Sequence, residues 1–284
     1  MGTMTQPNEL GEFLRSRRSR LSPTDVGLHG STARRVTGLR REELAVLAGV
    51  SADYYARLEQ GRARNISDSV LSAVADALRL DDLERRHLTE LVRPARSVSS
   101  TTSKPLRVRA ALRAMIHALD PTPAVLHGPR MEVLAINRAG AALLDDFEAM
   151  PPAERNMVHW MFLNPKARAV YPDWSDIAAQ LVAILRLAAG RDAGDQLLAA
   201  LIDEITAQSD EFATYWSDHR VSQHTHGPKR FEIESVGALT LNYEALIPPS
   251  DPELRVIIYT AEVGSPSEER LRELLKSRPV DVGT

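Results

Sequence analysis

The sequence predicts two domains of different fold class: an all-α domain of five helices, then an α+β domain with an antiparallel sheet of about five strands. Three observations carry this prediction. Apolar residues recur at helical spacing through residues 8–92. The Ser- and Thr-rich stretch RPARSVSSTTSKP, residues 93–105, has no such periodicity and is expected to be a linker. The rest begins with a strand pair, continues with helices and ends in alternating apolar residues.

The composition is that of an ordinary globular protein. The chain has 284 residues, a net charge of −3 and no Cys, which excludes disulfides, a thiolate metal site and a Cys nucleophile. No apolar run approaches the roughly 18 residues of a membrane span, and no signal peptide is recognisable. We therefore expect a soluble, cytoplasmic protein. The first residues, MGTM, resemble an addition ahead of a start at Met4.

Positive charge is concentrated near the start of the chain. Residues 1–96 carry 16 Lys and Arg against 13 Asp and Glu, whereas residues 97–284 carry 19 against 25. Between Leu10 and Arg41 there are eight Arg and two acidic residues, Glu12 and Asp25. Such a cationic surface suits an anionic polymer such as DNA, or it is a solvated helix face.

The first domain is expected over residues 8–92. The first helix, residues 8–20, should turn Leu10, Leu14 and Leu21 inward, and a long connection rich in turn formers follows at residues 22–38. Two short helices at residues 39–61 are then followed by helices at residues 67–80, capped by Ser67, and 81–92. Five helices therefore close a small domain.

The segment LRREELAVLAGVSADYYARLEQG, residues 39–61, predicts a helix-turn-helix unit. Gly49 permits a left-handed stop after the first helix, and Ser51 can cap the second. Tyr55 and Leu58 then fall on one side of the second helix, and Asp53 and Arg57 on the other with Ala52 and Ala56. The inner face of the first helix is expected to hold Leu44, Ala45 and Ala48.

This segment resembles the helix-turn-helix of xenobiotic-response-element, lambda-repressor-like regulators. The residues that carry the resemblance are Leu44, Ala45, Gly49, Val50, Ser51, Leu58, Glu59 and Gly61. It implies that Arg41 meets a phosphate, that Ala52, Asp53 and Arg57 face bases and that Tyr54 lies beside the DNA backbone. It also implies a structural pair between Arg18 on the first helix and Glu59.

Arg57 is the leading candidate for base recognition, because Arg can donate two hydrogen bonds to guanine. Asp53 could accept from a cytosine amino group or could orient Arg57, and Ala52 could touch a thymine methyl or be a simple helix former. The long connection departs from the simplest family members, and its Arg34 and Arg35 either reach the DNA or are solvated. The expected DNA-binding set is Arg34, Arg35, Arg40, Arg41, Ser51, Ala52, Asp53, Tyr54 and Arg57.

The second domain is expected over residues 106–265, with a C-terminal helix and tail at 266–284. A helix at residues 107–119 is expected first. Residues 122–144 then predict a strand, a turn at Gly128-Pro129, a second strand at 132–136 and a helix. Helices follow at residues 174–190, 195–208 and 210–219, and three strands at 230–233, 239–243 and 254–262.

This part resembles the ligand-binding domain of MmyB-like regulators, a subgroup common in antibiotic-producing actinobacteria. The matching stretches are TPAVLHGPRMEVLAINRAGAALL, RNMVHWMFLNPKARAVYPDW, SDEFATYWSDHRV and HGPKRFEIESVGALTLNYEAL. The resemblance implies a PAS-like fold with a pocket between sheet and helices for a small, mostly apolar molecule such as a fatty acid.

The middle of this domain concentrates aromatic side chains that can line a pocket or form ordinary core. Asn137 could point into the pocket or cap the next helix. The candidate ligand-binding residues are Asn137, Trp160, Phe162, Tyr171, Trp174, Tyr215, Trp216, His219 and Tyr243. Arg220 replaces the family's usual acid in HRV, which could alter a salt bridge or favour an anionic ligand. No metal site is expected at His219, His224 and His226, because no nearby Cys completes a site and the stretch precedes a turn at Gly227-Pro228.

The sequence as a whole indicates a ligand-responsive transcriptional regulator without a cofactor, apart from a bound lipophilic effector. We expect a homodimer on a palindromic double-stranded DNA operator and a small-molecule effector that shifts conformational populations. An enzyme with a helical accessory domain is the alternative, but no catalytic motif supports it. A protein-interaction adaptor is a further alternative, and Arg57→Ala separates it from a DNA reader.

Overall fold

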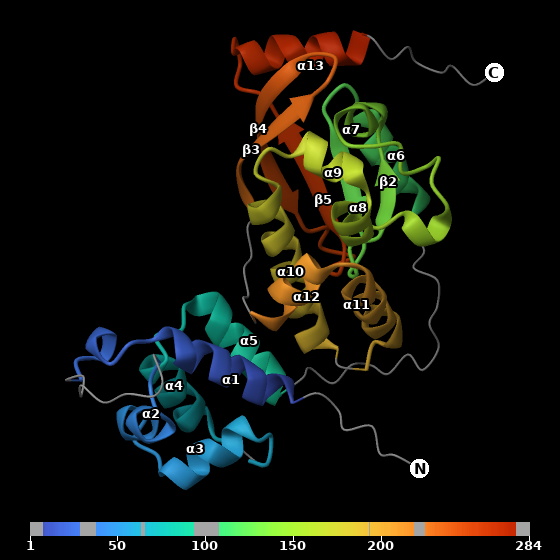
Figure 1. Ribbon diagram of the computed structural model, residues 1–284. Coiled ribbons are helices and arrows are strands. Elements are labelled where there is room, and N and C mark those ends of the chain that lie inside the picture. Colours follow the sequence, from blue (N-terminus) through green and yellow to red (C-terminus); the bar gives the residue numbers. More distant parts are fainter. Residues whose placement is uncertain are drawn as a thin grey trace. The chain divides into compact units, whose positions relative to one another are not determined.

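The computed structural model describes residues 8–28, 38–63, 66–93, 108–192, 194–218 and 225–276. The chain divides into two compact units. The first holds residues 1–99 with 189–195 and 216–222, and the second holds the remainder. Residues 8–93 are helical where described, whereas the part after residue 108 combines helices with an antiparallel sheet (Figure 1). The predicted fold classes are confirmed.

The described part of the first unit contains five α-helices and a short 3-10 helix. They are α1 (Glu9–Arg20), η1 (Thr24–Val26), α2 (Arg41–Leu47), α3 (Ala52–Glu59), α4 (Asp68–Ala77) and α5 (Asp82–Val92). Their starts follow from side-chain caps. The hydroxyl of Ser51 accepts the amide of Tyr54 at 3.1 Å, and that of Ser67 accepts the amide of Val70 at 3.3 Å. Gly49 has φ +64°, so the predicted left-handed stop is confirmed.

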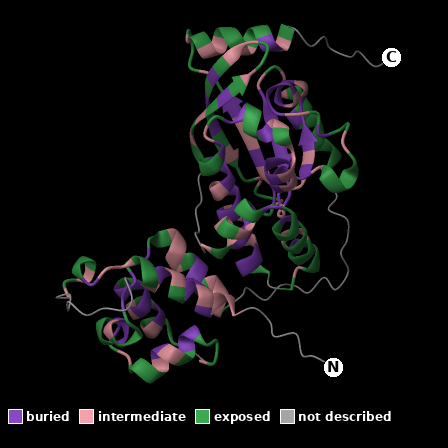
Figure 2. Ribbon diagram, in the orientation of Figure 1, coloured by how far each residue is buried: buried purple, intermediate pink, exposed green. Residues whose placement is uncertain are grey.

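Burial in this unit agrees with the predicted inner faces of α2 and α3 (Figure 2). Tyr55 and Leu58 of α3 are buried, and so are Leu44, Ala45 and Ala48 in and directly after α2. The expected inner face of α1 is wrong in part. Phe13 and Leu14 form the core there, whereas Leu10 and Leu21 are only half-buried.

Gly11 explains how α1 is rotated, because this residue lies directly against the end of α3. A Cβ at Gly11 would lie 1.9 Å from the backbone oxygen of Glu59. The side chain of Asn8 closes the same contact, since its Oδ1 accepts the amide of Gly11 at 3.0 Å and its Nδ2 donates to that Glu59 oxygen at 2.7 Å. The Gly11 side of α1 therefore faces α3, and this places Phe13 and Leu14 in the core.

The described part of the second unit is an α+β fold. Its strands are β1 (Ala124–His127), β2 (Val133–Ile136), β3 (His226–Ile233), β4 (Gly237–Leu246) and β5 (Arg255–Thr260). The helices that lie wholly or mainly in it are α6 (Ala110–Ala118), α7 (Arg138–Leu143), η2 (Pro152–Glu154), α8 (Met157–Leu163), α9 (Pro165–Val170), α10 (Trp174–Arg191), α11 (Gln196–Gln208), α12 (Asp210–Ser217) and α13 (Pro266–Lys276).

The sheet has the order β2-β1-β5-β4-β3, and every neighbouring pair is antiparallel. One face packs on α6, through Leu112 and Ile116 of the helix and Leu126 and Val256 of the sheet. Because side chains alternate along a strand, Tyr259 and the residues in register with it point to the opposite face. Helix α9 lies against that opposite face.

The third strand begins earlier than the expected residue 230. A turn was expected at Gly227-Pro228, but both residues lie within β3, which begins at His226. Pro is tolerated there because β3 is an edge strand and one side of its backbone needs no partner. Pairing of β3 with β4 runs without a break from His226 and Glu244 to Ile233 and Gly237.

Two short helices, α8 and α9, were not predicted. Asn156 caps α8, since its Oδ1 accepts the amides of Val158 and His159 at 2.8 and 3.2 Å. Asn164 caps α9 by accepting the amide of Lys166 at 2.9 Å, and Pro165 occupies the first turn. Each of these helices spans about two turns, which is too short for a periodic apolar pattern to appear.

Candidate DNA-binding surface and ligand-binding domain

Helix α3 divides its residues between the core and solvent as a recognition helix requires. Tyr55, Leu58 and Glu59 are buried, whereas Ala52, Asp53 and Arg57 are exposed. Tyr54 is half-buried at the margin between the two sides. The three residues expected to face bases therefore share one accessible face.

Arg57 is exposed but lightly held by its neighbours. Its Nη2 lies 3.5 Å from Asp53 Oδ2, and the Arg57 side chain is 53% exposed. Its guanidinium carbon lies 5.8 Å from the ring centroid of Tyr54. An exposed pair at this distance contributes less than about 1 kcal/mol, so Arg57 can leave Asp53 for a base at little cost.

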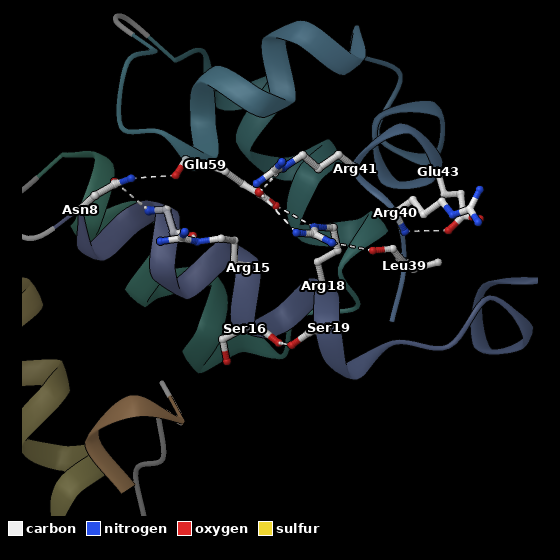
Figure 3. Close-up of polar contacts among 11 residues, drawn as sticks. Asn8, Arg15, Ser16, Arg18, Ser19, Leu39, Arg40, Arg41, Glu43 and Glu59 are labelled. Carbon is white, nitrogen blue, oxygen red and sulfur yellow. Dashed lines mark hydrogen bonds and ion pairs between the residues drawn. The ribbon is translucent and has the colours of Figure 1, made fainter. Parts of the chain in front are cut away.

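Behind this surface, the buried carboxylate of Glu59 joins three helices (Figure 3). Its Oε1 accepts from Arg18 Nε of α1 at 2.7 Å, which confirms the predicted structural pair. Its Oε2 accepts from Arg41 Nε of α2 at 2.6 Å. The Glu59 side chain is 0% exposed, whereas that of Arg41 is 49% exposed. Glu59 thus holds Arg41 at the surface next to the start of α2.

The charges around Glu59 perturb their neighbours. Burial lowers the pKa of Arg18, but hydrogen bonding and the charge of Glu59 outweigh burial and leave this pKa above its ordinary value. Burial raises the pKa of Tyr55, and the negative charge of Glu59 raises it further. Arg18 also donates to the backbone oxygen of Leu39 at 2.6 Å. Glu59, Arg18 and Arg41 therefore form an ion-pair network that holds α1, α2 and α3 together.

Of the other residues expected to contact DNA, two are exposed and two are not described. Arg40 is exposed and precedes α2, and its backbone amide donates to Glu43 Oε2 at 2.7 Å. Ser51 is exposed, but its hydroxyl already serves as the α3 cap. Arg34 and Arg35 lie outside the described residues.

Six of the nine expected ligand-binding residues of the second domain belong to two groups of aromatic side chains. The first runs from the helices to the sheet. Its successive ring centroids lie 5.2 to 6.4 Å apart, in the order Phe147, Trp160, Tyr171, Phe231, Tyr259 and Tyr243. We call this set the aromatic row. Burial raises the pKa of both Tyr171 and Tyr259.

The second group lies among the helices around Phe162. Its ring is 5.6 Å from Trp174, 5.1 Å from Phe212 and 6.3 Å from Tyr215. Trp174 Nε1 donates to the backbone oxygen of Met161 at 2.9 Å. Trp216 is half-buried in α12. His219, His224 and Arg220 lie outside the described residues.

Asn137 is a helix cap, the second of the two roles considered for it. Its Oδ1 accepts the amides of Gly140 at 2.8 Å and Ala124 at 3.0 Å, and its Nδ2 donates to the Thr122 oxygen at 2.7 Å. The residue is 1% exposed. Its amide is therefore committed to holding α7 against β1, and nothing in its contacts favours the ligand-binding role.

Sequence reasoning missed two polar residues on the sheet, His127 and Lys229. His127 is buried at the end of β1, and burial and the charge of Lys229 lower its pKa to about 4. Lys229 Nζ lies 4.2 Å from the ring centroid of Tyr243, the last member of the aromatic row. Lys229 is half-buried on the edge strand, and this partial burial lowers its pKa to about 8. The alternation in KRFEI, with Phe231 and Ile233 expected inward, was a signal that Lys229 also points inward.

A shallow depression of about 160 Å³ lies beside Trp160. Its lining residues are Met150, Glu154, His159, Trp160, Leu163, Asn164 and Pro165. Within the described ranges, no group of three His, Asp or Glu is arranged to hold a metal ion. No helix in the described part of the chain is both long and apolar enough to cross a membrane.

Two comparisons with protein families agree with this division of the chain. A family model described as a helix-turn-helix domain matches residues 9–88, and one described as the MmyB-like transcription regulator ligand binding domain matches residues 108–275. No curated protein matches the chain. The second family match covers more than half of the 284 residues. The chain therefore belongs to the MmyB-like transcription regulators, in which a DNA-binding helix-turn-helix domain is combined with a ligand-binding domain.

Proposed function

We propose that this regulator binds DNA sequence-specifically through α3 and that its second domain senses a small, mostly apolar molecule such as a fatty acid. The observation that carries the DNA part is the exposed face of Ala52, Asp53 and Arg57, backed by the buried Glu59. A helix with this division can enter the major groove while its other side stays in the core.

We further propose that the protein acts as a homodimer on a palindromic operator. In this arrangement two α3 helices read half-sites about 34 Å apart, which is one turn of DNA. Arg41, half-exposed at the start of α2, would meet a phosphate, and the exposed Arg57 would read guanine. The site of action would be the cytoplasm, on the nucleoid.

The ligand part rests on the aromatic row and the family of the second domain. The row contains Trp160, Tyr171 and Tyr243, three residues expected to touch the ligand, and it joins the helices to the sheet. Apolar and aromatic side chains with few polar groups are typical of small-molecule sites. We also propose that the second domain has a PAS-like fold. Ligand binding would shift the populations of DNA-competent and incompetent arrangements without catalysis.

Selection from random double-stranded DNA by the full-length chain tests the DNA part. We expect an enriched palindrome, bound by two chains in analytical ultracentrifugation. Recovery of unenriched DNA after several rounds would contradict sequence-specific binding.

Native mass spectrometry of the purified chain, followed by denaturing extraction, tests the ligand part. We expect a bound lipophile at a stoichiometric amount, and its addition should change the affinity for the selected operator. A lipophile that binds without any effect on operator affinity would contradict the proposed sensing role.

A further inference from the structure

Helix α6 covers only part of the sheet face on which it packs. It lies over β1, β2 and β5, away from the edge strand β3 (Figure 1). Leu246 of β4 projects to the same face, because it is in register with Val256 of the α6 core, and Glu244 does so opposite Ile258. Both β4 residues are exposed, and so is His226, the β3 partner of Glu244. We call this exposed part of the face the open half.

Apolar side chains are exposed on both halves of this face. Leu246 of the open half is 50% exposed, and Met115 of α6 is 45% exposed. Met115 lies between the buried side of α6 at Ile116 and its outer side at Ala114 and Ala118, so it occupies a flank of the helix. The small outer residues let another layer approach α6 closely. Exposed apolar groups that gather on one face are typical of a protein interface.

Met115 is on the flank of α6 that faces the open half. Helix α6 and strand β5 run in the same direction, since Arg109 before the helix pairs with Asp251 before the strand. Viewed along this direction with α6 above the sheet, β4 lies on the right, because the amide of the downward Tyr259 donates to the other side, to Pro123 ahead of β1. A right-handed helix seen in this way has Met115 on its right.

The two halves of the face also differ in charge. Helix α6 contains no acid and exposes Arg113, whereas the open half exposes Glu244. Neither the Arg113 guanidinium nor the Glu244 carboxylate forms a hydrogen bond or an ion pair with another described residue. Because α6 lies on the other half of the face, one chain does not bring these two groups together. A second copy of the chain offers each of them a partner of opposite charge.

We propose that the outer side of α6 packs on the open half of a second copy, so that the two α6 helices form one layer between two sheets. A two-fold axis that runs along the helices places each helix over the open half of the other sheet, and both copies then use the same surface. Met115 lies beside Met115 of the partner subunit, and Arg113 meets Glu244 of the partner subunit. This inference rests on the proposed homodimer and adds the surface through which it forms.

Met115→Cys tests this arrangement, because the chain has no Cys of its own and a residue beside the two-fold axis meets its own copy. We expect mild oxidation of the full-length variant to give mainly a disulfide-linked dimer, since a disulfide needs Cα atoms within about 7 Å. Leu197→Cys on α11 is the matched control, because Leu197 is also apolar and is 50% exposed. It should remain unlinked under the same conditions.

Arg113→Glu and Glu244→Arg test the charge pair by analytical ultracentrifugation of the full-length chain. Each variant should raise the Kd of the dimer at least about tenfold, because it brings like charges together. The double variant should recover most of this loss, since the pair is restored in reverse. Arg272→Glu on α13 changes the net charge by the same amount as Arg113→Glu and should leave the Kd unchanged.

The outcomes distinguish the interface from the homodimer itself. If the wild type is a monomer both free and on the selected operator, the homodimer proposal is wrong and the α6 interface falls with it. If the wild type is a dimer but Met115→Cys stays unlinked, or if neither charge reversal raises the Kd, the α6 interface is wrong. The homodimer proposal then stands, and its contacts lie on another surface.

Discussion

Glu59 Oε2 lies 2.6 Å from Arg41 Nε, so a carboxylate buried at the end of α3 holds an Arg at the exposed start of α2. The other oxygen of the same carboxylate holds Arg18 of α1 at 2.7 Å. One buried charge therefore fixes α3 in the domain and also holds Arg41, the side chain that we propose contacts a phosphate, beside it.

Glu59→Gln should destabilise the first domain by about 3 kcal/mol, because it leaves Arg18 partly buried without its counterion. Hydrogen exchange of α1 and α3 amides measures this locally, without assuming that the whole chain unfolds in one step. Asp53→Asn is the control on the same helix. Its carboxylate is exposed, so a loss below about 1 kcal/mol is expected. Equal losses in the two variants would contradict the role of Glu59.

Arg41→Gln should weaken binding to the operator and to random DNA by the same factor. A phosphate contact carries no sequence information, and its loss should reduce the slope of log K against log salt by about 1. Fluorescence anisotropy over a salt series provides the slope. Arg272→Gln on α13 removes a similar exposed charge in the other domain and should leave the slope unchanged. An unaltered slope in Arg41→Gln would place Arg41 away from the DNA.

Gly11→Ala should destabilise the first domain by about 3 kcal/mol, since the added Cβ meets the Glu59 backbone at 1.9 Å and α1 must separate from α3. Gly49→Ala is the comparison. Gly49 has φ +64° and no atom within 4 Å of an added Cβ, so only backbone strain of about 1 kcal/mol is expected. Hydrogen exchange of the α1 amides distinguishes the two variants, because it should speed up more in Gly11→Ala than in Gly49→Ala. The account of α1 packing is wrong if Gly49→Ala is the more damaging of the two.

His127 should make the stability of the second domain depend on pH between about 4 and 6.5. Burial and the charge of Lys229 lower its pKa from 6.5 to about 4 in the folded chain. Between these values the unfolded chain binds more protons, so stability falls as pH falls, by about 3 kcal/mol over the whole window.

Urea unfolding from pH 7 down to pH 4.5 measures this dependence. His127→Gln should flatten the curve, and Lys229→Met should raise the pKa of His127 in ring NMR spectra. If the free energy of unfolding of His127→Gln depends on pH as steeply as that of the wild type, His127 is not the group that causes this dependence.

The sequence predicted the first domain well, because its signals are local. Ser51 and Ser67 cap helices within three residues, and Gly49 ends α2 through its own backbone conformation. The rotation of α1 could not be predicted in this way. It depends on the contact of Gly11 with Glu59, 48 positions away, and periodicity alone favoured Leu10 over Phe13.

The second domain was predicted less completely, for two physical reasons. Helices α8 and α9 are too short to show a period, and their Asn caps resemble ordinary loop residues. Pro228 indicated a turn, although an edge strand tolerates it. Composition indicated the aromatic cluster, but only the register of β3 with β4 brings Lys229 to the end of the aromatic row.

The most direct test of sequence-specific DNA reading by α3 is the affinity of Arg57→Ala for the selected operator and for versions with single guanines replaced. Arg272→Ala is the matched control, because its side chain is 57% exposed and pairs with Glu268 four residues earlier, as Arg57 pairs with Asp53. We expect Arg57→Ala to lose about 1–3 kcal/mol of discrimination at one guanine, and Arg272→Ala to lose none. Unchanged discrimination in Arg57→Ala would contradict base reading by Arg57.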